Sequence, residues 1–144
     1  MKKYITLTLL FACFTGYSQT TEPVKETITR FFDAMRASDS SGVKSTLASG
    51  AIFQSITREN QVRTEDIRGF MASIAKAPKG SLDERISFTS VHIDGNLAAV
   101  WTPYEFYYNG QFSHCGVNSF QLHKEDGGWK IRYIIDTRRK ESCN

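Results

Sequence analysis

The stretch WTPYEFYYNGQFSHCGVNSFQLHKEDGGWKIRYIIDTRR, residues 101–139, decides the fold of this 144-residue chain. It holds two turn signals, Asn109-Gly110 and Asp126-Gly127. Such dipeptides favour two-residue hairpin loops, because both central residues of a type I′ turn need positive φ. Three strands joined by tight turns run antiparallel, and the turn positions set which side chains share a face. The stretch therefore predicts a double hairpin with one largely apolar face.

The two-residue loops also predict which side chains face each other across the strands. Glu105 lies opposite His114, Trp101 lies opposite Asn118, and Ile135 of the last strand lies on the other side of Asn118. A few polar groups in an apolar wall are typical of a ligand pocket. The predicted ligand-binding residues are Trp101, Asn118, Tyr133, Ile135, Thr137 and Arg139.

The predicted pair of His114 and Glu105 has two interpretations. A carboxylate can hold an imidazole in one tautomer, and such a histidine is a general base with a pKa near neutral pH. This arrangement suits a cofactor-independent isomerase, lyase (dehydratase) or hydrolase, for which His114→Ala would abolish turnover without unfolding the protein. The same pair also fits a structural cross-strand contact.

Helices are expected before these strands. Apolar residues recur at steps of three and four after Pro23, and Asp39 can cap a short second helix that ends near Gly50. The other expected elements are a helix at 64–76 capped by Thr64 and strands at 51–57, 85–93, 97–108, 111–123 and 129–138. The order α-α-β-α-β-β-β-β predicts an α+β fold in which a curved antiparallel sheet wraps over three N-terminal helices.

Several motifs in this order resemble one known superfamily. They are the helix at 64–76 and the sequences DGNLAAVW (94–101), FSHCG (112–116) and GWKI (128–131). The chain resembles the nuclear transport factor 2-like superfamily, in its small SnoaL-like or putative lumazine-binding branch. The resemblance implies a cone-shaped half-barrel with a cavity between sheet and helices. It implies no single activity, because the superfamily contains isomerases, dehydratases, cyclases, ligand carriers and protein-binding scaffolds.

Residues 1–19 have the pattern of a secretory signal peptide. A cationic start with Lys2 and Lys3 precedes an apolar run of about ten residues, which is too short to span a bilayer. Cleavage near Gln19 would leave one domain, 20–144, in a secreted or periplasmic location with no membrane anchor. Basic and acidic residues are almost balanced in this domain, so its charge does not indicate nucleic-acid binding.

The mature chain would keep two cysteines, Cys115 and Cys143. An oxidising compartment permits a disulfide between them. The predicted register, however, places Cys115 across from Thr137, several residues before Cys143. We therefore expect no bridge.

These patterns favour a protein that binds a small, partly apolar organic molecule in its cone. No cofactor or metal is expected, because the three histidines lack the spacing of a zinc site and no glycine-rich phosphate loop occurs. Two other interpretations stay open: the cofactor-independent enzyme, and a homodimeric interaction module whose cavity is filled by side chains. A dimer through the sheet would cover Tyr104, Phe106 and Tyr108, which are predicted on its outer face. Members similar to ketosteroid isomerase carry a Tyr and an acidic pair in the cavity, and this pattern has no residue-by-residue match in the sequence.

Overall fold

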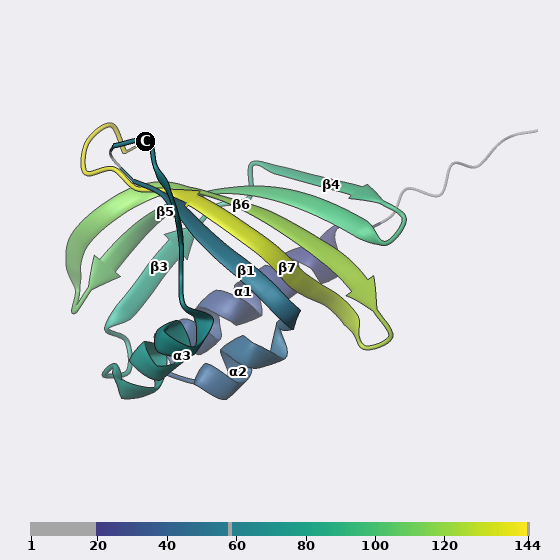
Figure 1. Ribbon diagram of the computed structural model, residues 1–144, viewed down its shortest axis with the longest axis horizontal. Helices are drawn as coiled ribbons and strands as arrows, with labels where there is room; N and C mark the ends of the chain where they lie inside the picture. The colour runs from purple at the N-terminus through teal and green to yellow at the C-terminus, as the bar shows by residue number, and fades with distance from the viewer. Residues whose placement is uncertain (1–19, 58, 144) are drawn as a thin grey trace, which may run out of the picture.

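Helices lie against the concave side of one curved sheet (Figure 1). The computed structural model describes residues 20–57 and 59–143, and the predicted signal peptide at 1–19 lies outside them. The elements in chain order are α1 (Glu22–Arg36), α2 (Ser40–Ser45), β1 (Leu47–Ile56), β2 (Val62–Thr64), α3 (Ile67–Lys76), β3 (Leu82–Ile86), β4 (Ser90–Asp94), β5 (Leu97–Tyr108), β6 (Gln111–Glu125) and β7 (Gly128–Thr137). The predicted α+β cone, with a curved and unclosed sheet over the helices, is confirmed.

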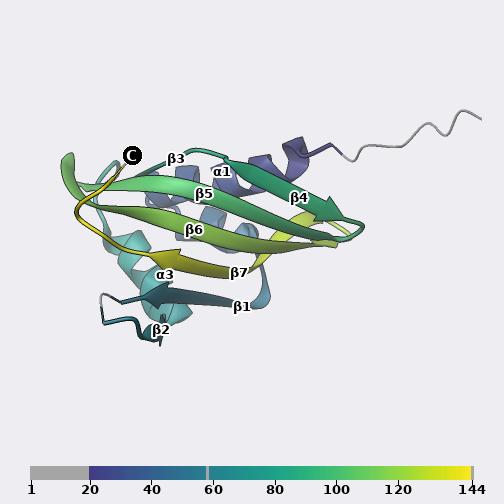
Figure 2. The same cartoon turned by 90° about the horizontal axis from the view of Figure 1, so that it is seen from above.

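The strands of the sheet follow the order β2-β1-β7-β6-β5-β3, and β4 pairs with a second part of β5. Figure 2 shows β5, β6 and β7 side by side, with β1 beyond β7. The strands from β3 to β7 form the predicted antiparallel meander, whereas β1 joins β7 in parallel. The short strand β2 was not predicted, and it pairs with the end of β1.

The predicted strand at 85–93 is wrong as a single element. It is two strands, β3 and β4, which both pair with β5. Between them, the Ser87 N–H donates to the carbonyl oxygen of Pro103, and the Thr89 N–H donates to that of Trp101. Pro103 has no N–H to donate in return, so the regular ladder is interrupted at this position.

Helix α1 buries the stripe that its sequence predicts. Its apolar residues at steps of three and four, Val24, Ile28, Phe31, Phe32 and Met35, are all buried. They pack against residues from the concave side of the sheet and from α2 and α3 in one hydrophobic core, which includes Val43, Phe53, Ile74, Val100, Phe120, Leu122 and Ile131. Among the described residues, no helix is long and apolar enough to cross a membrane.

The helix caps agree with the sequence for α2 and differ for α3. Asp39 caps α2, as predicted, by accepting a hydrogen bond from the Gly42 N–H at 2.8 Å. The residue that caps α3 is Asp66, not Thr64, because Thr64 belongs to β2. The second helix also ends earlier than predicted, since β1 already begins at Leu47.

The register between β5 and β6 differs from the prediction by one residue. The turn itself is a two-residue loop, with Tyr108 paired to Gln111. A bulge at Ser113 follows, because Tyr107 pairs with Phe112 whereas Phe106 pairs with His114. From His114 onward the inward side of β6 is as predicted, whereas Phe112, before the bulge, faces outward with Tyr107. On β5 the predicted inner and outer faces are exchanged.

A second bulge shifts β7 against β6. Leu122 pairs with Ile131 and Gln121 pairs with Tyr133, so Arg132 is the extra residue. Beyond this bulge Asn118 pairs with Asp136, not with Ile135. The predicted inner face of β7 is therefore correct before Arg132 and reversed after it.

The prediction that Cys115 and Cys143 stay unbridged is wrong. They form a disulfide with their Cα atoms 5.9 Å apart. After β7, Arg139 pairs with Cys115 through two backbone hydrogen bonds of 2.9 Å. The chain then turns back at Ser142, whose φ is 54°, and this reversal brings Cys143 to the outer side of β6.

Candidate functional site

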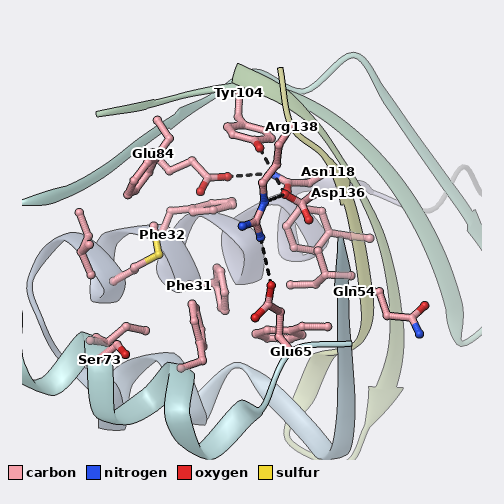
Figure 3. Close-up of a pocket in the computed structure, with 18 of the residues that line it drawn as sticks. Phe31, Phe32, Gln54, Glu65, Ser73, Glu84, Tyr104, Asn118, Asp136 and Arg138 are labelled. Carbon is pink, nitrogen blue, oxygen red and sulfur yellow. Dashed lines mark hydrogen bonds and ion pairs between the residues drawn. The ribbon is translucent and has the colours of Figure 1, made fainter. Parts of the chain in front are cut away.

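The concave side of the sheet and the helices enclose a cavity of about 310 Å³. Most of its lining is aromatic or aliphatic: Phe31, Phe32, Met35, Phe53, Phe70, Ile74, Leu82, Phe106, Phe120 and Ile134. Figure 3 shows polar side chains gathered at its sheet side, among them Glu84, Tyr104, Asn118, Asp136 and Arg138. An apolar pocket with a few convergent polar groups is the usual form of a small-molecule site.

Glu84 is held from β3 by the amide of Asn118 on β6. The Asn118 Nδ2 donates to the Glu84 Oε1 at 2.8 Å. Burial raises the pKa of the Glu84 carboxyl to about 7; the Asn118 hydrogen bond opposes this increase, and the Asp136 carboxylate adds to it. Near neutral pH this carboxyl can therefore exchange a proton, and in its neutral form it can donate a hydrogen bond.

Tyr104 and Asp136 form a second polar group in the same wall. The Tyr104 hydroxyl donates to Asp136 Oδ2 at 3.3 Å and to the carbonyl oxygen of Thr137 at 3.0 Å. Burial raises the pKa of Tyr104, and the negative charge of Asp136 raises it further, so the hydroxyl stays protonated. Arg138 completes this group, because its Nε donates to Asp136 Oδ2 at 2.8 Å.

Arg138 also reaches across the cavity to Glu65, just before α3 (Figure 3). Its Nη2 lies 3.5 Å from Glu65 Oε1, and Glu65 accepts a further hydrogen bond from the Ser55 hydroxyl at 3.4 Å. These contacts link the end of β7 to β1 and to the start of α3. The arginine therefore shares its charge between two carboxylates.

His114 lines the cavity, and among the described residues no carboxylate pairs with it. Its ring packs against Tyr104 and Phe106, with centroids 5.6 and 5.2 Å away, and its Nδ1 is 3.1 Å from the Ser113 hydroxyl. Burial lowers the pKa of His114, and the positive charge of Arg138 lowers it further. The ring is therefore mainly neutral at pH 7 and offers a hydrogen bond, not a charge.

The structure places only part of the predicted site in this cavity. His114 and Asn118 line it. Glu105 lies on the other side of the sheet, where it pairs with Cys115 and accepts a hydrogen bond from the Tyr107 hydroxyl at 2.8 Å. The predicted facing pair of Glu105 and His114 is therefore wrong, because the bulge at Ser113 shifts β5 by one residue.

The other predicted ligand-binding residues also lie outside the cavity lining. Trp101 is 49% exposed and pairs with Ser119. Tyr133, Ile135 and Thr137 lie beyond the bulge at Arg132. The Tyr133 hydroxyl donates to Gln54 Oε1 at 2.6 Å, and the Thr137 hydroxyl oxygen accepts from the Val117 N–H at 3.2 Å. Ile135 pairs with Ser119. Arg139 lines a neighbouring surface pocket.

Sequence reasoning missed the residues that carry the polar wall, which are Glu65, Glu84, Tyr104, Asp136 and Arg138. The signal that was available is the alternation of Ile134, Asp136 and Arg138, which puts two charged residues on the same face as a buried isoleucine. The apolar run at 133–135 hides that signal, since either face can be taken as the inner one. Within residues 20–57 and 59–143, no three His, Cys, Asp or Glu side chains are grouped to hold a metal ion.

Comparison with known proteins agrees with this architecture. Residues 19–132 match the family model described as putative lumazine-binding. The chain belongs to this putative lumazine-binding family. It is also a member of the nuclear transport factor 2-like superfamily, as its motifs suggest. Membership supports a ligand-binding domain. No curated protein matches the sequence.

Solved structures share the fold of this chain at low sequence identity. An NTF2-like protein of unknown function from Shewanella baltica has a TM-score of 0.67 and 17% identity, over 88% of this chain and 99% of that one. One from Silicibacter pomeroyi has a TM-score of 0.66 and 17% identity, over 84% and 100%. A putative dehydratase of the NTF2-like family from Streptomyces avermitilis has a TM-score of 0.62 and 18% identity, over 83% and 95%. These likenesses concern the fold alone.

Proposed function

We propose that this protein binds a small, partly apolar organic molecule in the cavity of its cone. The observation that carries the proposal is the cavity of about 310 Å³ itself, with an aromatic lining and with Glu84 and Asn118 on its sheet side. The volume falls in the range of small-molecule sites. It counts against an interaction module whose interior is filled by side chains. Family membership supports the same conclusion.

Native mass spectrometry of the protein purified from its own host tests this proposal, because a retained molecule adds its mass to the chain. A fluorescence titration with N-phenylnaphthylamine, a neutral apolar dye, gives a second readout. Ser73→Trp places a ring in the lining from α3 and should weaken dye binding about tenfold or more. Ala72→Trp is the matched control, because Ala72 is exposed and does not line the cavity. Equal binding by both variants would contradict the proposal.

A second candidate function is proton transfer on the bound molecule. The predicted general base, His114 held by Glu105, is not formed in the structure. Glu84, however, has a pKa of about 7 and lies in the cavity wall with Tyr104 and Asp136. A base titrating near the operating pH and a hydroxyl that donates hydrogen bonds suit enolisation or dehydration. A tyrosine with two carboxyl groups is also what the resemblance implies for members similar to ketosteroid isomerase.

Deuterium uptake distinguishes this second candidate from binding alone. The molecule recovered from the protein is incubated with it in deuterated water, and its mass is followed. Proton transfer is supported if the protein catalyses deuterium exchange and Glu84→Gln abolishes it. His92→Gln, on β4, is the control and should retain the exchange. A bound molecule that gains no deuterium faster than it does in buffer would leave binding as the function.

We also propose that the protein acts outside the cytoplasm. The signal-like pattern of residues 1–19 supports this location, and so does the Cys115–Cys143 disulfide, because structural disulfides persist mainly in oxidising compartments. The test is the mass of the protein recovered from a periplasmic extract. Cleavage near Gln19 is expected, and a full-length cytoplasmic chain would contradict the proposal.

A further inference from the structure

Next to the cavity lies a second hollow, which we call the vestibule. It has a volume of about 340 Å³ and shares Glu65, His114 and Arg138 with the cavity. The rest of its lining includes Arg63 from β2 and Arg139 and Lys140 after β7. The vestibule is therefore a polar space directly beside an apolar one.

Cations outnumber carboxylates in the vestibule. Arg138 is paired with Asp136 and Glu65. Over the part of the chain that the structure describes, no carboxylate lies within ion-pair distance of Arg63, Arg139 or Lys140. The side chain of Arg139 donates from Nε to the carbonyl oxygen of Ser142 at 3.1 Å. Several uncompensated cations in one hollow produce a positive potential that attracts an anion.

Deeper in the cavity the wall holds the carboxyls of Glu84 and Asp136 beside the Tyr104 hydroxyl. Arg138 already pairs with Asp136, and the ionised form of Glu84 would repel an anion. The two spaces together therefore favour one orientation: an anionic group in the vestibule, an apolar body between α1 and the sheet, and a neutral polar group beside Glu84 and Asn118.

We propose that the ligand is an organic anion with an apolar body, a carboxylate or sulfonate whose charged end is held by Arg63, Arg139 and Lys140. This inference rests on the proposed binding function and specifies the chemical class of the ligand. It assigns the cations to recognition of the charged end and the aromatic lining to recognition of the body.

Two related dyes test the ligand class. Anilinonaphthalene sulfonate carries a sulfonate on the same ring system as neutral N-phenylnaphthylamine, so the pair isolates the charge. The double variant Arg63→Gln/Lys140→Gln should bind the sulfonate about tenfold more weakly, because it loses two cations near the anionic group. Its affinity for the neutral dye should change less than twofold. Lys79→Gln/Lys124→Gln is the matched control, since it removes the same charge away from both spaces.

The outcomes separate this inference from the proposed function. A selective loss of sulfonate binding in the vestibule variant supports the inference. An equal loss of both dyes, or the same sulfonate affinity in the vestibule variant and the control, overturns it while binding of the neutral dye still supports the cavity. Failure of the folded wild-type protein to bind either dye overturns both proposals.

Discussion

Glu84 and Asp136 are two carboxyl groups in one cavity wall, and their neighbours decide their behaviour. Asp136 accepts hydrogen bonds from Tyr104 and Arg138, and Arg138 adds a full positive charge beside it. The Glu84 carboxyl instead accepts a hydrogen bond from the neutral amide of Asn118. Burial raises the pKa of Glu84 to about 7, and the Asn118 hydrogen bond and the positive charge of Arg138 only partly oppose this increase. This pKa makes Glu84 the centre of the site.

Glu84→Gln should change how stability depends on pH. The folded protein holds the Glu84 proton more tightly than the unfolded chain does, so wild-type stability is lost as pH rises from the ordinary value of 4.5 to about 7. Glutamine keeps a carbonyl acceptor for Asn118 and does not titrate. Between pH 5 and pH 8 the variant should therefore gain about 2 kcal/mol in unfolding free energy relative to wild type. Urea denaturation at both pH values measures this, and a constant difference would contradict it.

Gly116→Ala should destabilise the protein strongly. A Cβ at Gly116 would lie 1.8 Å from the carbonyl oxygen of Thr137 and 2.8 Å from the Tyr104 ring. Backbone must shift to admit it, at a cost of about 3 kcal/mol. Gly127→Ala is the control, because nothing lies within 4 Å of a Cβ there, and its effect should stay within about 0.5 kcal/mol. Urea denaturation of both variants gives the comparison, and similar values for the two would refute this account.

The C-terminal segment after β7 is an element whose position depends on covalent and backbone contacts to β6. It has little apolar burial of its own, and it carries Arg139 and Lys140 into the vestibule. The Cys115–Cys143 disulfide and the backbone pairing of Arg139 with Cys115 hold it in place. The geometry of the vestibule therefore depends on the disulfide and on this backbone pairing.

Reduction of the disulfide should lower stability by about 3.6 kcal/mol. The bond closes a loop between residues 28 apart in sequence, and the chain-entropy argument gives this magnitude for such a loop. Urea denaturation with and without a reductant measures the difference. Cys143→Ser should show the lower stability with and without reductant. If reductant does not change the stability of the wild-type protein, the disulfide does not contribute to its free energy of unfolding.

At the scale of elements, much of the fold was predictable from local chemistry. The limits of β5 and the two-residue loop after it match the prediction, because Asn109-Gly110 satisfies the backbone of that turn. The caps of α3 and the division into β3 and β4 were not predictable in this way. They depend on which strand each segment pairs with, as the positions of Thr64 in β2 and Ser87 beside Pro103 show.

For the whole molecule, dimerisation through the sheet remains a prediction. The exposed residues that would form the interface differ from those that the sequence indicates. Tyr104 is 4% exposed and Phe106 lines the cavity, so neither is available on the outer face. That face instead presents Leu97 and Trp101 of β5, both exposed. Exposed aromatic and aliphatic residues on one face of a sheet are typical of an interface.

Trp101→Glu should convert a dimer to a monomer, because it places a charge within the predicted interface. Val62→Glu is the control, since Val62 is equally exposed but lies on β2 at the far edge of the sheet. Size-exclusion chromatography with light scattering gives the mass of each. A monomeric wild-type protein, or a dimer that survives Trp101→Glu, would contradict the prediction.

The sequence by itself determined the fold class, the helix stripes, the turns and the inward direction of His114 and Asn118. These follow from periodicity and turn chemistry, which act over a few residues. Only the tertiary structure decided the site, because two bulges, at Ser113 and Arg132, exchange the faces of β5 and of the end of β7. A shift of one residue reverses every side chain beyond it. The two shifts place Glu105 on the outer side of the sheet and Tyr104, Asp136 and Arg138 at the cavity, where hydrogen bonds among the three hold them.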